Sequence, residues 1–266
     1  MSNESQAEAV PNRFLTHCSL LIAHCCHPGY YVRGNFIPIA TLHPNTKTPM
    51  SIRGLIFDLD GTLVDALPDL TAALNRMLER RGLAPLTQTD VRPMIGDGTK
   101  KLVERALAAR GAPYDDTTER AMVADYTEHV AAESRPYPGV NATLGRLQEA
   151  GWKFAICTNK STAATEALLK ALEMAHWFAA LGCGDSFAVR KPDPGHLAGT
   201  IAAAGGTATR SIMVGDHAND IAVGKALSLP TIFASWGYGK PEMGDGASAV
   251  AERFAALATL GPKLVS

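Results

Sequence analysis

The sequence lacks an excess of charge of either sign, long apolar runs and a cysteine framework. Its 266 residues include 25 lysine and arginine residues against 26 aspartate and glutamate residues, a formal net charge of −1. The chain therefore has no overall field that would attract nucleic acid or an anionic membrane. The absence of any run of about 18 apolar residues argues against a transmembrane helix. Five cysteines, an odd number, do not indicate a disulfide framework, so we expect a reduced, cytoplasmic protein.

The composition is that of a globular protein, with 46% hydrophobic and 19% charged residues. Residues 1–49 differ from the remainder, because no amphipathic period runs through them and prolines at 11, 28, 38 and 44 would interrupt any helix. They contain a His-Cys-Cys-His cluster at 24–27, but adjacent cysteines do not suit the usual loop of a zinc site. We predict a poorly ordered extension over residues 1–49 and a folded protein from residue 50 onward.

The stretch 54–65 carries the residues that are most informative about chemistry. Residues 54–57 are a short apolar run, the pattern of a strand that is buried on both faces of a parallel sheet. Asp58 and Asp60 follow, and Gly61 allows the chain to bend so that both carboxylates lie at the carboxyl end of the strand. Open α/β sheets bind ligands at that end. Two carboxylates held together repel each other, so we expect a cation beside them, although an ordinary acidic turn would explain this motif alone.

A second strand, predicted over 152–157, also ends in polar residues. Thr158 and Asn159 follow it, and a helix begins near Ser161. A helix N-terminus offers backbone donors and a favourable dipole, so this strand end suits an anion. A hydroxyl residue that simply caps the helix is the alternative interpretation.

Two later motifs complete the set of polar strand ends. Lys191 precedes Pro192, whose restricted backbone would hold the lysine ammonium in place to bind a phosphoryl oxygen. A strand predicted over 211–214 leads to Asp216 and, one helical turn later, to Asp220. Carboxylates at this spacing suit Mg²⁺, which prefers oxygen ligands.

Residues 67–136 show helical periodicity and no convincing strand, which predicts an all-helical cap inserted into the α/β chain. Within them, Gly96 and Gly98 would let a loop backbone approach a ligand closely. Basic residues flank this loop, and one of them, such as Lys100, could hold a substrate carboxylate, although a solvated helix face is the alternative. We therefore predict a core made of residues 50–66 and 137–266 and a cap made of residues 67–136.

We predict a Rossmann-like α/β core with a parallel sheet of five strands and a final helix near 249–260. The predicted strands are 54–57, 152–157, 179–183, 211–214 and 231–234.

The chain carries four motifs at its predicted strand ends: Asp-x-Asp-x-Thr, Thr-Asn, Lys-Pro and Gly-Asp-x-x-x-Asp. They occur in the same order as in the haloacid dehalogenase-like superfamily. Over about residues 50–260 the chain resembles the phosphatases of this superfamily. The segment Ile95-Gly96-Asp97-Gly98, with residues 104–107, is similar to the phosphoglycolate phosphatase branch.

This resemblance implies a role for each motif. Asp58 would be the nucleophile that forms an aspartyl-phosphate, and Asp60 would be the general acid and base. The phosphoryl oxygens would be held by Thr158 and Lys191. The resemblance also implies a substrate-binding group, which consists of Gly61, Thr62, Asn159, Gly96, Gly98 and Lys100. Mg²⁺ would be bound by Asp58, Asp60 (through its carbonyl), Asp216 and Asp220.

The resulting expectation is a Mg²⁺-dependent phosphatase of a small phosphorylated metabolite, with 2-phosphoglycolate favoured, acting as a monomer or homodimer. A sugar-phosphate mutase of the same superfamily is the nearest enzymatic alternative, since it shares both acids and a helical cap. A phosphonatase, which would form a Schiff base through a lysine of the cap, Lys100 or Lys101, is a further alternative within the superfamily. A receiver module, which would hold its phosphate instead of releasing it, is the alternative from another class.

Overall fold

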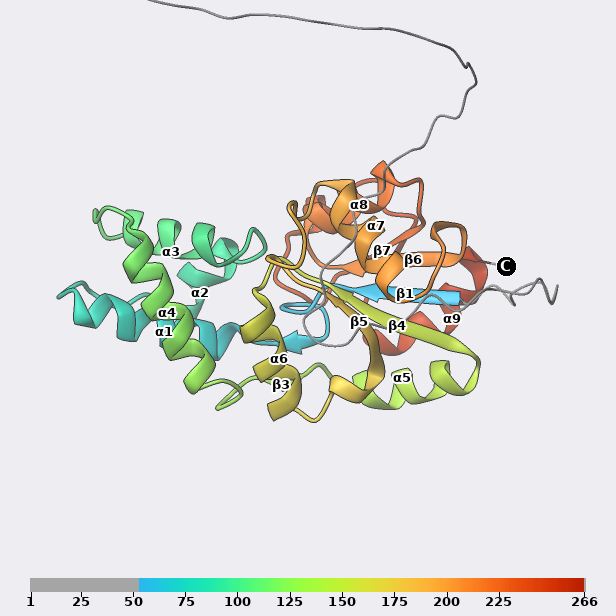
Figure 1. Cartoon of the computed structure of the whole chain (residues 1–266), viewed down its shortest axis with the longest axis horizontal. Helices are drawn as coiled ribbons and strands as arrows, with labels where there is room; N and C mark the ends of the chain where they lie inside the picture. Colours follow the sequence, from blue (N-terminus) through green and yellow to red (C-terminus); the bar gives the residue numbers. More distant parts are fainter. Residues whose placement is uncertain (1–52, 266) are drawn as a thin grey trace, which may run out of the picture. The chain divides into compact units, whose positions relative to one another are not determined.

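The computed structural model describes residues 53–265, and the predicted extension over residues 1–49 lies outside them. Strands alternate with helices along most of this part of the chain (Figure 1). No helix among the described residues is both long and apolar enough to cross a membrane. The strands are β1 (Arg53–Phe57), β2 (Val64–Asp65), β3 (Arg135–Pro136), β4 (Trp152–Cys157), β5 (Phe178–Gly182), β6 (Ser211–Gly215), β7 (Thr231–Ala234) and β8 (Ala249–Ala251). The α-helices are α1 (Leu67–Arg80), α2 (Gln88–Val91), α3 (Thr99–Ala108), α4 (Asp116–Glu128), α5 (Val140–Glu149), α6 (Thr162–Ala171), α7 (Pro194–Ala203), α8 (Ala218–Ala226) and α9 (Leu257–Leu264).

Six of the strands form one parallel sheet in the order β5-β4-β1-β6-β7-β8, which confirms the predicted α/β class. Strand β1 lies between β4 and β6, so the carboxyl ends of these three strands lie next to one another. The residues that follow β1, β4 and β6 are therefore brought to one edge of the sheet. This topology is what gathers Asp58, Thr158 and Asp216, which are far apart in the sequence.

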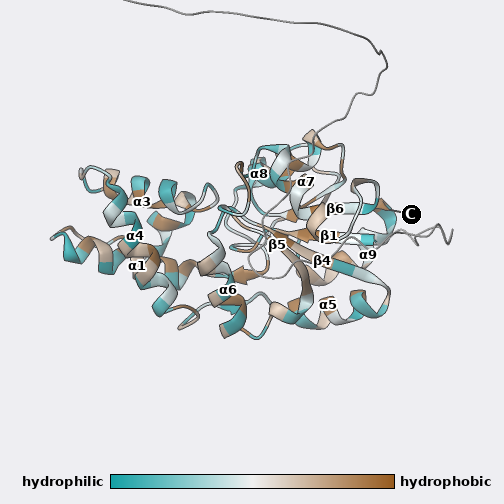
Figure 2. Ribbon diagram, viewed as in Figure 1, coloured by the Kyte–Doolittle hydropathy of each residue, from teal (hydrophilic) through white to brown (hydrophobic). Residues whose placement is uncertain are grey.

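Helices cover both faces of the sheet. Along β1, Leu55 and Phe57 belong to one buried cluster, while Ile56 belongs to another on the opposite face. This alternation follows from the twofold side-chain period of a strand. The ring of Phe57 stacks on that of Phe254, with centroids 5.6 Å apart. In Figure 2 the strands are predominantly brown, and the helices around them alternate between brown and teal, as expected for elements with one buried face.

The sequence-based prediction of five strands was wrong, because a sixth strand, β8, pairs in parallel with β7. The predicted helix near 249–260 is replaced by this strand and by α9, which begins at Leu257. Strand β8 has only three residues, Ala-Val-Ala, and Val250 is 57% exposed at the sheet edge. So short an alanine-rich segment has no strand period to recognise, and its pairing with β7 determines its structure.

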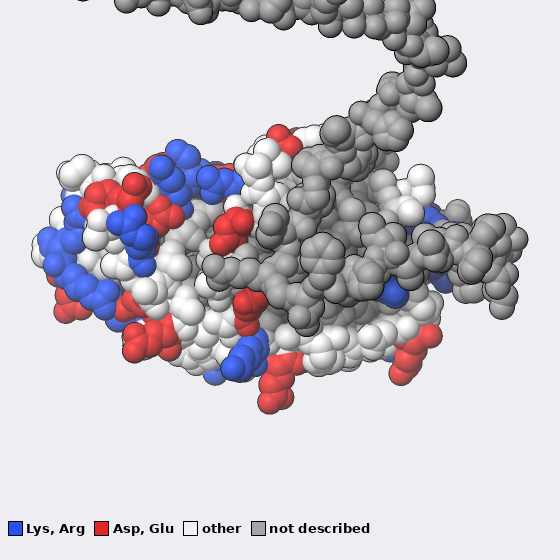
Figure 3. All heavy atoms as spheres, in the orientation of Figure 1, with Lys and Arg blue, Asp and Glu red and all other residues white. Residues whose placement is uncertain are grey.

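Helices α1 to α4 follow one another with no strand between Leu67 and Ser134 in the described chain, and they group together at one side in Figure 1. Acidic and basic side chains are interspersed over this segment in Figure 3, as expected from the near-zero net charge. Its assignment to a separate cap domain stays a prediction.

The chain enters and leaves this helical segment through β2 and β3, which pair antiparallel. Next to this ribbon, the buried carboxylate of Asp69 accepts hydrogen bonds from the amides of Glu133 and Ser134, at 2.9 and 3.0 Å. The Ser134 hydroxyl donates a third, at 2.6 Å. The start of α1 and the return strand are thereby fixed to each other.

Candidate active site

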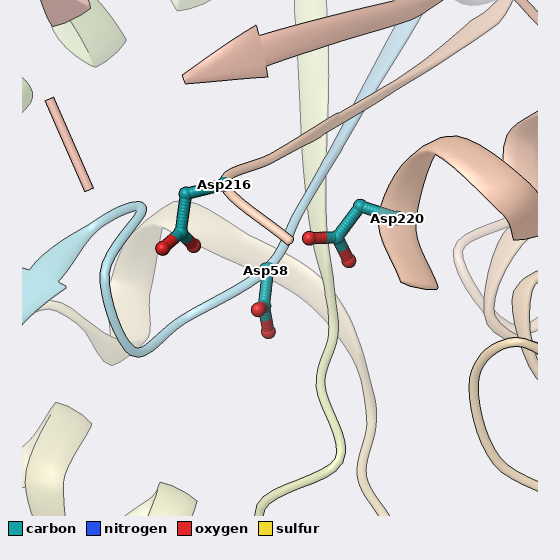
Figure 4. Close-up of side chains that lie close together, drawn as sticks. All are labelled: Asp58, Asp216 and Asp220. Atoms are coloured by element: carbon teal, nitrogen blue, oxygen red, sulfur yellow. The ribbon is translucent and has the colours of Figure 1, made fainter. Parts of the chain in front are cut away.

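Three buried carboxylates meet at the carboxyl edge of the sheet (Figure 4). Asp58 follows β1, Asp216 follows β6 and Asp220 lies in the first turn of α8. Each contributes an oxygen to a group in which all three atoms lie within 4.8 Å of one another. Their exposures are 6%, 3% and 0%. The sequence predicted this convergence from strands that end in carboxylates, although the distances could not be predicted.

Lys191 is the cation that contacts this group. Its Nζ lies 2.9 Å from Oδ1 of Asp58 and 2.7 Å from Oδ1 of Asp220. The backbone of Lys191 is fixed by a hydrogen bond to Nδ1 of His196 and by one from the side-chain amide of Asn159, both at 3.0 Å. Burial alone would lower the pKa of Lys191, but the two carboxylates raise it above its usual value, so the ammonium stays charged.

Asp216 is held by neutral donors. Its carboxylate accepts hydrogen bonds from the Thr62 hydroxyl at 2.8 Å and from the Tyr238 amide at 2.7 Å. Burial, reinforced by the charges of Asp58 and Asp220, raises its pKa to about 7. Gly61 adopts a φ of 87°, and a Cβ there would lie 2.4 Å from Oδ2 of Asp216, so only glycine fits beside this carboxylate.

The donor set fits a hard divalent cation. Three carboxylates and one ammonium leave a formal charge of −2 in a buried site when all are ionised. A divalent ion would offset this charge, and carboxylate oxygens are the ligands that such an ion prefers. The acidic cluster is thus a candidate metal site by its chemistry as well as by its geometry.

A second ion pair lies beside the cluster. Nζ of Lys160 is 3.0 and 3.2 Å from the two carboxylate oxygens of Asp60. It also lies 4.2 Å from the ring centroid of Tyr126, a residue of α4. Burial raises the pKa of Asp60, while Lys160 acts in the opposite direction. The sheet edge therefore meets the helical segment through this lysine.

Two cavities open onto these carboxylates. Asp58 and Asp60 line both of them, and the empty space, counted together with the open mouth of each cavity, is about 420 and 300 Å³. The larger cavity is also lined by Thr158, Asn159 and Lys160 from the loop after β4, and by Leu70, Ile95, Gly96, Gly98, Thr99 and Leu102 from the helical segment. The reacting groups of a small substrate in this cavity would therefore be enclosed by both parts of the chain.

The loop around residues 95–98 contacts the sheet edge directly. The side-chain amide of Asn159 donates to the Gly96 carbonyl at 3.0 Å, and that of Asn219 donates to Oδ1 of Asp97 at 2.8 Å. Gly98 has a φ of 87°, and a Cβ there would lie 3.0 Å from the Asn159 carbonyl oxygen. Glycine therefore allows this loop to reach the site.

The structure distributes the predicted site residues over three positions. Facing the larger cavity are Asp58, Asp60, Thr158, Asn159, Gly96 and Gly98. Next to Asp58 lie Lys191, Asp220 and Asp216, of which Asp216 also lines the smaller cavity. Thr62 and Gly61 contact or closely approach Asp216. Lys100 does not line either cavity, and its Nζ lies 5.1 Å from the ring centroid of Tyr114.

Sequence reasoning missed Lys160 and Tyr238. The only available signal for Lys160 was its position directly after Thr158 and Asn159, because its ion-pair partner is 100 residues away in the sequence. Tyr238 follows β7, and its hydroxyl accepts hydrogen bonds from the amides of Ala66 and Leu67 at 2.7 and 2.9 Å. It thus links the loop after β7 to the start of α1.

Residues 52–227 match the model of the haloacid dehalogenase-like hydrolase family. Over 228 residues the chain is 44% identical to the phosphoglycolate phosphatase of Agrobacterium fabrum, covering 83% of this chain and 97% of that one. It is 43% identical over 188 residues to that of Caulobacter vibrioides, covering 69% and 79% of the two chains. A crystal structure of a predicted phosphoglycolate phosphatase from Haemophilus somnus superposes with a TM-score of 0.73 at 28% identity, covering 78% of this chain and 97% of that one.

Proposed function

Because this chain belongs to the haloacid dehalogenase-like hydrolase family, we propose that it is a phosphatase that hydrolyses 2-phosphoglycolate with the help of Mg²⁺. The family membership confirms the resemblance found in the sequence. The curated relatives support both the reaction class and the substrate, since they are named phosphoglycolate phosphatase and align over most of the chain. A cytoplasmic location stays an expectation.

The position of Asp58 carries the proposal. This carboxylate belongs to the acidic cluster and also lines the larger cavity, so a phosphoryl group could meet it there. Its Oδ1 accepts a hydrogen bond from the Leu59 amide at 2.8 Å and contacts Nζ of Lys191. These donors orient the carboxylate, and we assign to it the attack on phosphorus that forms an aspartyl-phosphate while the ester P–O bond breaks.

Asp60 is assigned the proton transfers. It would protonate the departing alkoxide oxygen, and in the second step it would accept a proton from the water that attacks the phosphorus of the aspartyl-phosphate, releasing inorganic phosphate. Donation requires the protonated carboxyl, and burial shifts the pKa of Asp60 in that direction. The ion pair with Lys160 opposes this shift, so it must weaken when substrate is bound.

Thr158 and Lys191 are assigned the phosphoryl oxygens. Thr158 is 2% exposed and lines the cavity, and Lys191 is fixed beside the nucleophile. Asp58, Asp216 and the carbonyl of Asp60 would hold Mg²⁺, with Asp220 in support. When bound, the ion would neutralise the charge that the anionic nucleophile and the phosphoryl group bring together.

The proposal is tested by measuring the release of inorganic phosphate from 2-phosphoglycolate and a panel of small phosphoesters, with Mg²⁺ or with EDTA. We expect many turnovers per protein with Mg²⁺, and a loss of roughly 10³-fold or more in kcat for Asp58→Asn, since the amide is a far poorer nucleophile. Substantial activity of this variant would contradict the assignment of the nucleophile.

The alternatives give different outcomes in the same assay. A mutase would convert one sugar phosphate into another without releasing phosphate. A receiver module would stop after one phosphoryl transfer per chain and retain the label.

A further inference from the structure

The larger cavity contains a positive charge that the proposed chemistry leaves without a substrate partner. Among residues 53–265, Lys160 is the only lysine or arginine that lines this cavity. Its side chain is 5% exposed and its ammonium contacts both oxygens of Asp60. A buried ammonium of this kind is strongly oriented, unlike a lysine on a solvated helix face.

The other basic residues near the site are directed elsewhere. Lys191 contacts Asp58 and Asp220, and Lys101 pairs with Glu104 at 2.7 Å. Arg92 lines the smaller cavity, where its guanidinium lies 5.4 Å from the ring centroid of Tyr238. Of the described lysines and arginines, Lys160 is therefore the one that a second anionic group of a substrate in the larger cavity would meet.

The backbone fixes where the side chain of Lys160 begins relative to the phosphoryl-binding groups. Lys160 is two residues from Thr158, and its amide donates to the Thr158 hydroxyl at 3.3 Å. Its carbonyl accepts a hydrogen bond from the Gly184 amide at 2.8 Å, which anchors the loop to the segment that follows β5. The loop after β4 thus presents a hydroxyl for one end of a short substrate and an ammonium for the other.

A further polar atom lies next to the Lys160 ammonium. The hydroxyl of Tyr126 is buried and has no hydrogen-bond partner among the described residues, and the residue is 3% exposed. Buried hydroxyls without a partner are rare in folded proteins, so this hydroxyl can pair with the Lys160 ammonium or with a group bound beside it. The Lys160 ammonium and this hydroxyl are both donors, the combination that a carboxylate requires.

We infer that Lys160 binds the carboxylate of the substrate and thereby selects phosphomonoesters with an anionic group close to the phosphoryl group. The inference rests on the proposed phosphatase function and makes Lys160, in place of Lys100, the residue that determines specificity. On binding, the ammonium exchanges the Asp60 carboxylate for that of the substrate, so it never remains buried without a counter-charge.

The test compares two substrates of equal length, 2-phosphoglycolate and 2-hydroxyethyl phosphate, which differ in the carboxylate alone. In the wild-type protein kcat/KM should favour 2-phosphoglycolate, and in Lys160→Met the ratio of the two kcat/KM values should fall about 10- to 100-fold, the range of a hydrogen bond between charged partners. Any effect that Lys160 exerts through Asp60 acts on both substrates and cancels in this ratio.

The matched control is Lys170→Met, which removes an exposed lysine from the next helix, α6, and should leave the ratio unchanged. Lys160→Arg keeps the charge and the pairing with Asp60, so it should fold and retain part of the preference. Binding can be compared with two phosphonates that the protein does not turn over. Phosphonoacetate should inhibit the wild-type protein far more strongly than ethylphosphonate does, and Lys160→Met should remove this difference.

An equal loss on both substrates in Lys160→Met would show that the lysine acts only through Asp60 and would overturn the inference. No change in either kcat/KM value, or a ratio that falls in Lys100→Met instead, would also overturn it. Failure of the proposed function would look different, since the wild-type protein would then release phosphate from neither substrate in the presence of Mg²⁺.

Discussion

The buried carboxyl group of Asp216 should make the stability of this protein depend jointly on pH and on divalent cations. Burial and the charges of Asp58 and Asp220 raise its pKa to about 7 from an ordinary value of 3.8. Without a metal, the folded protein therefore holds a proton on Asp216 at a pH where the unfolded chain has already released it. The proton takes the place of the missing cation in neutralising the site.

The sign and size of the effect follow from this difference. The folded state binds more protons than the unfolded state between pH 3.8 and about 7, so the free energy of unfolding falls as the pH rises through this window. From pH 5 to pH 8 the folded protein loses its extra proton over about two pH units, which corresponds to roughly 2.6 kcal/mol at 1.36 kcal/mol per unit. A cation favours the ionised carboxylate and should remove this loss. Mg²⁺ should thus stabilise the protein by roughly 2–3 kcal/mol more at pH 8 than at pH 5.

The assay is urea unfolding, followed by tryptophan fluorescence between pH 5 and pH 8, in EDTA and in saturating Mg²⁺. The control is Asp216→Asn, which keeps the shape of the side chain and removes its titration. Asp220, whose burial raises its pKa to about 6, titrates in the same window and interacts with Asp216. The difference between the two pH profiles therefore reports the titration of Asp216 together with its coupling to the neighbouring carboxylates. Equal slopes in EDTA for the wild-type protein and the variant, or Mg²⁺ stabilisation that is the same at pH 5 and pH 8, would refute the reasoning.

Two further predictions concern the helical segment. Asp69→Ala removes the acceptor of the Glu133 amide and of the two buried donors of Ser134, and it should lower the free energy of unfolding by about 2–4 kcal/mol in urea titrations. A change within about 0.5 kcal/mol would contradict this prediction. Asn219→Ala removes the contact to Asp97 that holds the loop over the site, and it should raise KM about 3- to 10-fold in steady-state assays with kcat little changed. A fall in kcat at constant KM would instead assign Asn219 to the chemical step.

Much of the sheet and its site could be predicted from the sequence, because both depend on local patterns. Apolar runs such as 54–57 identify buried strands, and a parallel sheet must bring their carboxyl ends to one edge. Asp58 and Asp216 could be assigned to that edge without knowing any distance. Strand β8 could not be predicted, since its three residues have no period of their own and form a strand only by pairing with β7.

The two lysines of the site show where sequence reasoning reaches its limit. Lys191 was identifiable because Pro192 restricts the local backbone, a property that is visible in the chain itself. Lys160 has no such local signal: it becomes informative only when Asp60 from the end of β1 and Tyr126 from α4 lie against it. The charge of a side chain can be predicted from its type, whereas the partner of that charge is decided by the tertiary fold. The proposed role of Lys160 in substrate specificity depends on such tertiary contacts. It is therefore harder to predict from the sequence than the proposed roles of residues that belong to a local motif.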